Sequence, residues 1–245
     1  MAAPQFFTDP ADLTEELAVL RGEEARHATQ VLRLTVGEPL RVADGSGRVA
    51  EATAVLLRPG EVRAQVRALR REPPARPALT VVAGLIKGGR LDLVVQKLTE
   101  LGVARIAPAL CRRSVVAWDA RKQAAVRARW TQIALAAAKQ ARRVRLPEIA
   151  PLAPLADQLA AAPRPCLVCW EDAGPSRPLA AALPTATPDA LALVVGPEGG
   201  LEAAEVAAAR AGGAVPVTLG RLVLRSDTAA IAAAAAVAFR YGTLG

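Results

Sequence analysis

The sequence is poor in the side chains from which metal centres and base-stacking surfaces are built. It has three cysteines and a single histidine, His27. A zinc site needs about four such ligands, so we expect no bound metal. Phe, Trp and Tyr make up only 3% of the residues. This scarcity argues against ordered binding of single-stranded nucleic acid by stacking alone.

Long apolar runs are also missing. A membrane-spanning helix needs about 18 or more apolar residues, and the candidate Ala229–Phe239 is too short and too rich in alanine. The first residues do not combine a basic region with an apolar core, so we expect no signal peptide. These features predict a cytoplasmic protein with no membrane partner.

The cysteines fit this expectation. Cys166 and Cys169 form a CxxC within the apolar run 165–170, and Cys111 stands alone. Residues three apart in a strand point to opposite faces. We therefore expect two buried thiols in a core strand rather than a zinc or redox motif.

Charge is unevenly distributed along the chain, whose formal net charge is +8. Lys and Arg minus Asp and Glu give −1 for residues 1–75, +11 for residues 76–150 and −2 for residues 151–245. A basic excess confined to one third of the chain favours a polyanionic partner.

The first part of the chain, residues 1–72, is typical of a small β-rich domain. One helix is expected at Glu23–Arg33, and Asp44–Gly47 is a strong hairpin signal. The strands expected around that signal are Leu40–Ala43, Val49–Leu57 and Val62–Leu69. Three prolines in Glu72–Pro77 predict an extended linker, residues 73–78.

From residue 79 to 245 the pattern alternates between strand and helix, which predicts an α/β domain with a mostly parallel sheet. No GxGxxG follows the expected strand Leu79–Leu85, which disfavours a nicotinamide-dependent dehydrogenase. Further expected elements are the helix Leu91–Leu101, the strand Val103–Ala107, the helix Ala120–Ala141, the strand Cys166–Trp170 and the helix Thr228–Phe239.

Two glycine-bearing loops follow strand-like runs near the C-terminus. Leu191–Val195 leads into Gly196–Gly200, and Val215–Leu219 leads into a loop that reaches Thr228. Ligands bind at such carboxyl ends of strands in open α/β sheets. We expect a buried carboxylate at Glu198 and a close approach of the Gly199 backbone to a ligand.

Basic residues gather at the ends of other expected elements, namely at Lys87–Arg90, Arg112–Ser114 and Lys139–Arg145. Cations at the end of a helix are often only solvated complements to its dipole. The segment charge favours binding of nucleic acid instead.

In these residues the sequence resembles the RsmE family of 16S ribosomal RNA uracil-N3 methyltransferases, in the SPOUT superfamily. The resemblance spans essentially the whole chain. It rests on His27 with Val31–Arg33, Asp44–Gly47, Gln96–Lys97 with Glu100–Gly102, Arg113–Val116, Trp130 with Ile133–Ala134, Gln140 with Arg143–Glu148, Gly196–Gly200, Leu219–Gly220 with Leu224–Arg225 and Thr228–Ala230, and Arg240–Gly245.

The resemblance implies an N-terminal PUA-like RNA-binding β-barrel and a C-terminal SPOUT domain with a trefoil knot. It also implies S-adenosylmethionine as methyl donor, 16S rRNA of the 30S subunit as partner, and a homodimer. The implied cofactor-binding residues are Trp170, Glu171, Val195, Gly196, Pro197, Glu198, Gly199, Gly200, Leu219, Gly220, Leu222, Leu224, Arg225 and Thr228.

RNA-binding positions are expected in both parts of the chain: Arg26, His27, Arg33, Lys87, Arg90, Arg113, Gln140, Arg142, Arg143 and Arg145. Arg225 is expected to stabilise charge on the uracil carbonyls, and Asp227 or Glu198 is the candidate general base. Asp227 departs from the family's usual Glu, and the sequence does not identify the base.

Two other functions are compatible with these patterns. A ribose 2′-O-methyltransferase of the same superfamily would share the fold and the cofactor. A non-catalytic RNA-binding ribosome assembly factor would share only the RNA surface.

Overall fold

A computed structural model of the chain describes residues 3–114, 118–173 and 177–244, so Val115 and Val116 of the family motif lie outside the described residues. The chain divides into two compact units. The first unit comprises Met1–Pro74 and Ala138–Leu146, and the second comprises Ala75–Ala137 and Pro147–Gly245.

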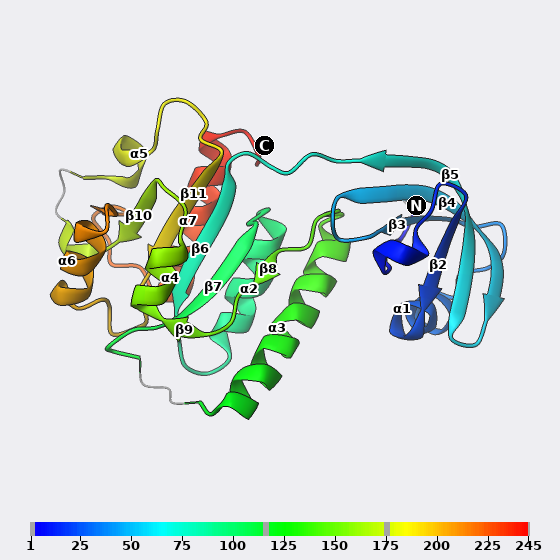
Figure 1. The fold of residues 1–245 in the computed structure, drawn as a ribbon, viewed down its shortest axis with the longest axis horizontal. Coiled ribbons are helices and arrows are strands. Elements are labelled where there is room, and N and C mark those ends of the chain that lie inside the picture. The colour runs from blue at the N-terminus through cyan, green and yellow to red at the C-terminus, as the bar shows by residue number, and fades with distance from the viewer. Residues whose placement is uncertain (1–2, 115–117, 174–176, 245) are drawn as a thin grey trace. The chain divides into compact units, whose positions relative to one another are not determined.

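The first unit is built on a sheet that, among its described residues, has five strands (Figure 1). In spatial order they are β1 (Gln5–Phe7), β3 (Pro39–Ala43), β4 (Arg48–Arg58), β5 (Glu61–Arg71) and β2 (Leu17–Arg21). All neighbours are antiparallel except β1 and β3. Strands β3 to β5 were predicted, whereas β1 and β2 were not.

The predicted helix of the first unit is divided in two. It consists of α1 (Gly22–Arg26) and the π-helical turn η2 (His27–Val31). A short 3-10 turn, η1 (Pro10–Asp12), precedes β2. Ala25 and Ala28 face the core, where they join residues such as Phe6 and Leu20.

The predicted hairpin at Asp44–Gly47 joins β3 to β4. Asp44 is buried, and its carboxylate accepts hydrogen bonds from the Ser46 hydroxyl, the Ser46 amide and the Arg48 amide. Burial opposes ionisation, but these hydrogen bonds hold the pKa of Asp44 below its usual value. The charged carboxylate of Asp44 therefore stabilises the turn.

Residues 138–146 group with the first unit, whereas the prediction included them in the domain of residues 79–245. The Gln5 amide donates to the Arg143 carbonyl oxygen at 2.7 Å, and Arg145 donates to the Glu72 carbonyl oxygen at 2.7 Å. These bonds complete the unit with a segment that is distant in sequence.

The second unit contains a parallel sheet, and its described strands are seven in number. Its order is β12 (Val215–Val217), β10 (Cys166–Cys169), β11 (Ala190–Val195), β6 (Ala78–Gly84), β7 (Arg105–Leu110) and β8 (Glu148–Ile149), and β9 (Ala153–Pro154) also pairs with β7. The predicted parallel α/β class is confirmed.

Helices cover both faces of this sheet. Side chains from α2 (Arg90–Glu100), α3 (Ala120–Gln140), α5 (Leu179–Ala182) and α7 (Ser226–Arg240) join one core cluster. Side chains from α4 (Leu155–Ala161) and α6 (Ala203–Ala211) join a second core cluster on the opposite face. A 3-10 turn, η3 (Glu171–Ala173), follows β10.

The CxxC prediction is confirmed in part: both cysteines lie in β10, where Cys166 is buried and Cys169 is half-buried. Cys166 belongs to the cluster of α4 and α6, whereas Cys169 packs against the opposite cluster. Both thiols, and that of Cys111, are free. In the described part of the chain, no helix is long and apolar enough to span a membrane.

Candidate active site

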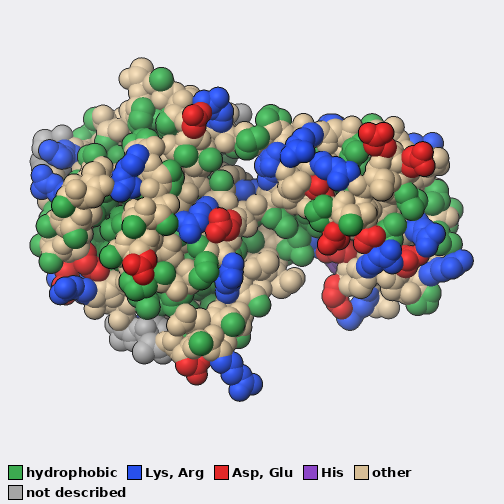
Figure 2. All heavy atoms as spheres, in the orientation of Figure 1, with side chains coloured by type: hydrophobic (Ala, Val, Ile, Leu, Met, Phe, Trp, Pro, Cys, Tyr) green, Lys and Arg blue, Asp and Glu red, His purple; other side chains and the backbone are tan. Residues whose placement is uncertain are grey.

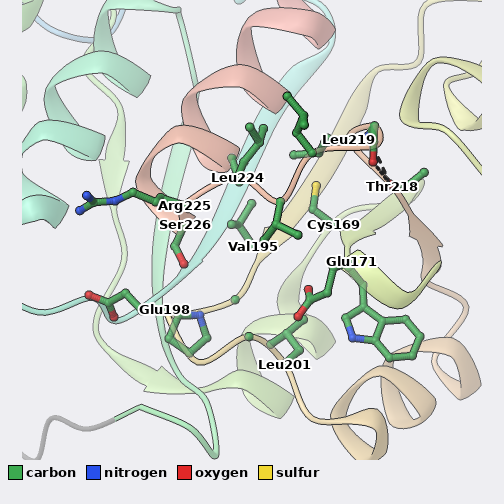
Figure 3. Close-up of a pocket in the computed structure, with 18 of the residues that line it drawn as sticks. Cys169, Glu171, Val195, Glu198, Leu201, Thr218, Leu219, Leu224, Arg225 and Ser226 are labelled. Atoms are coloured by element: carbon green, nitrogen blue, oxygen red, sulfur yellow. Dashed lines mark hydrogen bonds between the residues drawn. The ribbon is translucent and has the colours of Figure 1, made fainter. Parts of the chain in front are cut away.

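A cavity of about 350 Å³ lies at the carboxyl ends of β10, β11 and β12 (Figure 3). This volume falls within the range of small-molecule sites, about 300–1,000 Å³. Cys169 is the last residue of β10, Val195 is the last residue of β11, and Thr218 directly follows β12. All three residues line the cavity. The strands are parallel, so their following loops meet at one edge of the sheet.

Most of the expected cofactor residues line this cavity. They are Trp170, Glu171, Val195, Gly196, Pro197, Glu198, Gly200, Leu219, Gly220, Leu222, Leu224 and Arg225. Gly199 and Thr228 are not among the lining residues. The sequence reasoning did not assign Cys169, Leu201 or Ser226 to the site, although each adjoins a predicted residue.

Three glycines allow close packing of the backbone around the cavity. A Cβ on Gly84 would lie 2.5 Å from the Pro197 nitrogen, and one on Gly196 would lie 2.9 Å from Leu201 Cγ. A Cβ on Gly200 would lie 2.7 Å from Glu171 Oε1, and Gly200 also has a φ of +72°. Only glycine satisfies these distances without movement of the loops.

Gly199, whose backbone is expected to approach the ligand, is not among the residues that line the cavity. A Cβ at this position would meet Arg113 Cβ at 3.1 Å instead of entering the cavity. Arg113 donates to the Gly199 carbonyl oxygen at 2.8 Å, and its Nε lies 3.9 Å from Glu202. Arg113, predicted to bind RNA, therefore supports the Gly196–Gly200 loop from outside the cavity.

The N-terminus of α6 is tied to the segment after β7. Glu202 and Glu205 form a capping box, in which Glu205 Oε2 accepts from the Glu202 amide at 2.9 Å. The other oxygen of Glu205 accepts from the Arg112 amide at 2.9 Å. These bonds fix the loop that leads from β11 into α6.

Glu198 is exposed, which corrects the expectation of a buried carboxylate. Its Oε1 accepts from the Lys87 amide at 2.9 Å and pairs with Arg90 Nη2 at 2.6 Å. Arg90, another predicted RNA-binding residue, itself lines the cavity, whereas the Lys87 side chain is exposed. Burial was misjudged because the partner loop, 87–90, is distant in sequence.

The two candidate catalytic residues lie at the start of α7. Arg225 lines the cavity and is 67% exposed. Asp227 is not a lining residue; its Oδ1 accepts from the Thr228 amide at 2.9 Å and lies 3.6 Å from Arg225 Nε. In Figure 3, Glu198, Arg225 and Ser226 lie together, across the cavity from Glu171.

The cavity wall contains a protonated thiol. Burial, with a smaller contribution from Cys166, raises the pKa of Cys169 to about 12. Among the described residues, no cluster of three His, Cys, Asp or Glu side chains is arranged to hold a metal ion.

The remaining predicted RNA-binding residues belong to the first unit and differ in exposure. Arg26, Arg33, Gln140 and Arg142 are exposed. His27 is half-buried, with its ring centroid 6.2 Å from that of Phe6.

Arg143 and Arg145 are half-buried. Burial lowers the pKa of Arg143 to about 10. The guanidinium of Arg145 lies against Gly47, where an added Cβ would be 2.3 Å from Arg145 Nη2. These two arginines contribute to the packing of the first unit.

The charge of each unit differs from that of the sequence thirds. The first unit carries 14 Lys and Arg against 11 Asp and Glu, and the second carries 17 against 12. Figure 2 shows basic and acidic side chains interspersed over one face of each unit. The +11 excess of residues 76–150 is therefore shared between the two units.

Comparison with known proteins identifies the class. Residues 73–238 match the RNA methyltransferase domain, and residues 20–64 match the RNA methyltransferase PUA domain. The fold, the cavity at the strand ends and these matches define the chain as an RNA methyltransferase of α/β type with an N-terminal PUA domain.

Individual relatives narrow the assignment. The chain is 37% identical over 243 residues to the ribosomal RNA small subunit methyltransferase E of Mycobacterium bovis, covering 97% of this chain and 92% of the relative. It is 31% identical to the protein of that name from Bacillus subtilis, covering 90% and 89%. The chain thus belongs to the ribosomal RNA small subunit methyltransferase E family, as its motifs predicted.

A solved structure of a relative supports the same assignment. The ribosomal RNA small subunit methyltransferase E of Neisseria gonorrhoeae, bound to S-adenosyl methionine, superimposes with a TM-score of 0.85. The two chains are 29% identical, and 97% of each is covered.

Proposed function

We propose that this protein methylates N3 of a specific uridine in 16S rRNA of the small ribosomal subunit, in the cytoplasm, with S-adenosylmethionine as donor. The observation that carries the proposal is the cavity at the ends of β10, β11 and β12. Its lining contains most of the residues that the family motifs assign to the cofactor.

The lining suits such a donor. Val195, Leu201, Leu219 and Leu224 provide apolar walls for an adenine and a methylene chain. Gly196 and Gly200 also line the cavity and add no side chain that would fill it. When bound, S-adenosylmethionine supplies a methyl group on a sulfonium centre, which N3 of the base accepts after losing its proton.

We assign to Arg225 the stabilisation of the negative charge that develops on the uracil. Removal of the N3 proton spreads negative charge onto the uracil carbonyls, which the positive charge of a guanidinium stabilises. Asp227 lies beside Arg225 at 3.6 Å and accepts from the Thr228 amide. These contacts favour a role in orienting Arg225 and the start of α7 over a role as general base.

Two finer features of the fold belong to the same proposal. The five-stranded sheet of the first unit forms a PUA-like barrel, and residues from β11 to α7 form a trefoil knot. In support of the knot, β12 pairs with β10 at one edge of the sheet, while α7 packs back on β11, β6 and α2. The loop 218–225 therefore leads from the edge strand β12 back to the middle of the sheet.

The protein acts as a homodimer. Leu222 and Val223 in the cavity loop are 80% and 86% exposed, and Phe239 near the end of α7 is 76% exposed. An interface between two copies would bury these apolar side chains, which the single chain leaves in water.

Light scattering tests the dimer directly. We expect twice the subunit mass at micromolar concentration for the wild type and the subunit mass for Phe239→Lys. A lysine is compatible with the C-terminus of a helix, so this change leaves the fold intact. A monomeric wild type would contradict the homodimer.

The reaction is tested with 30S subunits that lack the modification. Incubation with labelled donor, followed by digestion to nucleosides, should release N3-methyluridine. Recovery of 2′-O-methylated nucleosides would instead establish the ribose methyltransferase. RNA binding without donor binding or methyl transfer would establish the non-catalytic assembly factor.

A further inference from the structure

The loop 87–90 brings an arginine to the cavity from outside the three segments that were predicted to hold the cofactor. Gly88 and Gly89 have φ values of +70° and +72°, so the chain turns sharply after β6. Arg90 follows as the first residue of α2 and lines the cavity. Its position therefore depends on how well this turn is fixed.

Glu198 fixes the turn and the guanidinium together. One carboxylate oxygen accepts from the Lys87 amide at 2.9 Å and from Arg90 Nη2 at 2.6 Å. Arg90 Nε also donates to the Lys87 carbonyl oxygen at 3.3 Å. Arg90 and Glu198 are 33% and 32% exposed, so the pair is accessible from solvent and from the cavity.

Three of the charged residues that line the cavity, Arg90, Glu198 and Arg225, gather at one end of it. Glu198 and Arg225 lie on the same side, away from Glu171 (Figure 3), and Arg90 is bonded to Glu198. A guanidinium has several N–H donors in a fixed fork, and the two described bonds of Arg90 leave others to face an acceptor.

We infer that Arg90 is a specificity-determining residue that donates to a carbonyl oxygen of the target base, and that Glu198 is the positioning residue that holds it. This inference rests on the proposed function. A donor at this place favours uracil, whose C4 carries a carbonyl oxygen, over cytosine, whose C4 carries an amino group. A phosphate beside the target nucleotide presents the same oxygen chemistry, so the experiment separates the two.

The first test compares Arg90→Ala, Arg90→Lys and the wild type. We expect Arg90→Ala to lower turnover about tenfold or more, with donor affinity unchanged. Arg90→Lys should fall between them because it keeps the charge and loses the fork. Arg121→Ala, at an exposed arginine near the start of α3, is the matched control and should behave as wild type.

Salt dependence decides which oxygen Arg90 contacts. A base contact leaves the slope of log affinity for RNA against log salt unchanged in Arg90→Ala. A phosphate contact reduces that slope by about 0.7–0.9 and would overturn the assignment to the base. Unchanged turnover in Arg90→Ala would overturn the whole inference.

Glu198 variants separate positioning from general-base catalysis. A glutamine keeps the oxygen that accepts from Lys87 and Arg90, so Glu198→Gln should retain turnover within about threefold and the same pH profile. Glu198→Ala should resemble Arg90→Ala, and the double variant should be no worse than either. Loss of activity in Glu198→Gln equal to that in Glu198→Ala would contradict the positioning role.

Circular dichroism and donor binding establish that each variant is folded. If the wild type does not methylate RNA, the proposed function fails. If it does and Arg90→Ala matches it, only the inference about Arg90 fails.

Discussion

At the scale of single residues, the cavity is shaped as much by missing side chains as by present ones. Gly84, Gly196 and Gly200 stand where a Cβ would lie within 3 Å of another atom. Glycine runs after apolar strands are visible in a sequence, and here they lie beside the cavity at the strand ends. The direction in which each glycine faces is not visible in the sequence, and a Cβ on Gly199 would face Arg113.

Gly200→Val should lower affinity for S-adenosylmethionine by about tenfold or more. The added side chain meets Glu171 Oε1, and the positive φ of Gly200 strains any other residue. Calorimetry on the folded variant measures the change. Gly199→Ala is the neighbouring control, because its Cβ faces Arg113 outside the cavity; an equal loss there would mean that the loop moves as a whole.

The thiols of buried Cys111 and half-buried Cys169 predict a loss of stability at alkaline pH. Burial raises the pKa of Cys111 and of Cys169 from 9.0 to about 12, with a smaller contribution from Glu205 at Cys111. Between these values the unfolded chain releases protons that the folded chain retains. The free energy of unfolding therefore decreases as pH rises from about 9 to about 12.

Denaturant melts across this range test the prediction. A Cys111→Ala and Cys169→Ala double variant should show a shallower decrease. Thiol reagents at pH 8 should label the folded wild type slowly and the unfolded chain quickly. Rapid labelling of all three folded thiols would contradict the burial.

At the scale of elements, periodicity predicted most of the second unit because its strands and helices are long enough to show a pattern. It missed β1, a strand of three residues, because alternation is not visible over so short a run. It also could not show that residues 138–146 return to the first unit. Contacts such as that of Lys139 with Glu24 join residues far apart in sequence.

Arg145→Ala should destabilise the first unit by about 1–3 kcal/mol, because Arg145 donates to the Glu72 carbonyl oxygen in a partly buried setting. Arg142→Ala should change stability by less than about 0.5 kcal/mol, because Arg142 is exposed. Hydrogen exchange of residues 39–71 measures the effect, with the strands of the second unit as internal reference. Equal effects of the two changes would contradict a packing role for Arg145.

At the scale of the whole molecule, the excess of basic residues predicted a polyanionic partner, but it did not predict which arginines are exposed in the folded protein. The sequence placed the whole excess in residues 76–150, but part of it folds into the first unit. There Arg143 and Arg145 are engaged in packing, whereas Arg33 and Arg142 are exposed. Folding thus separates arginines available to RNA from arginines used in the fold, a distinction that charge counting cannot make.

Arg33 and Arg142 are the non-glycine residues with positive φ in the described part of the chain, at 53° and 54°. This conformation costs an ordinary residue about 1–2 kcal/mol relative to the right-handed one, and glycine avoids that cost. Strain of this kind accumulates at functional sites, so we expect both arginine side chains to bind a partner. RNA phosphates are the partner that matches two exposed cations.

Replacement of both by glycine should therefore separate stability from binding. Arg33→Gly with Arg142→Gly should melt no lower than the wild type, because relief of backbone strain offsets the greater freedom of the unfolded chain. RNA affinity should decrease, and the log–log salt slope should become shallower by about 1.4–1.8, the amount for two lost phosphate contacts. S-adenosylmethionine affinity should not change, since neither residue lines the cavity. Filter binding at several salt concentrations measures the slope, and an unchanged slope would mean that these arginines do not contact the RNA backbone.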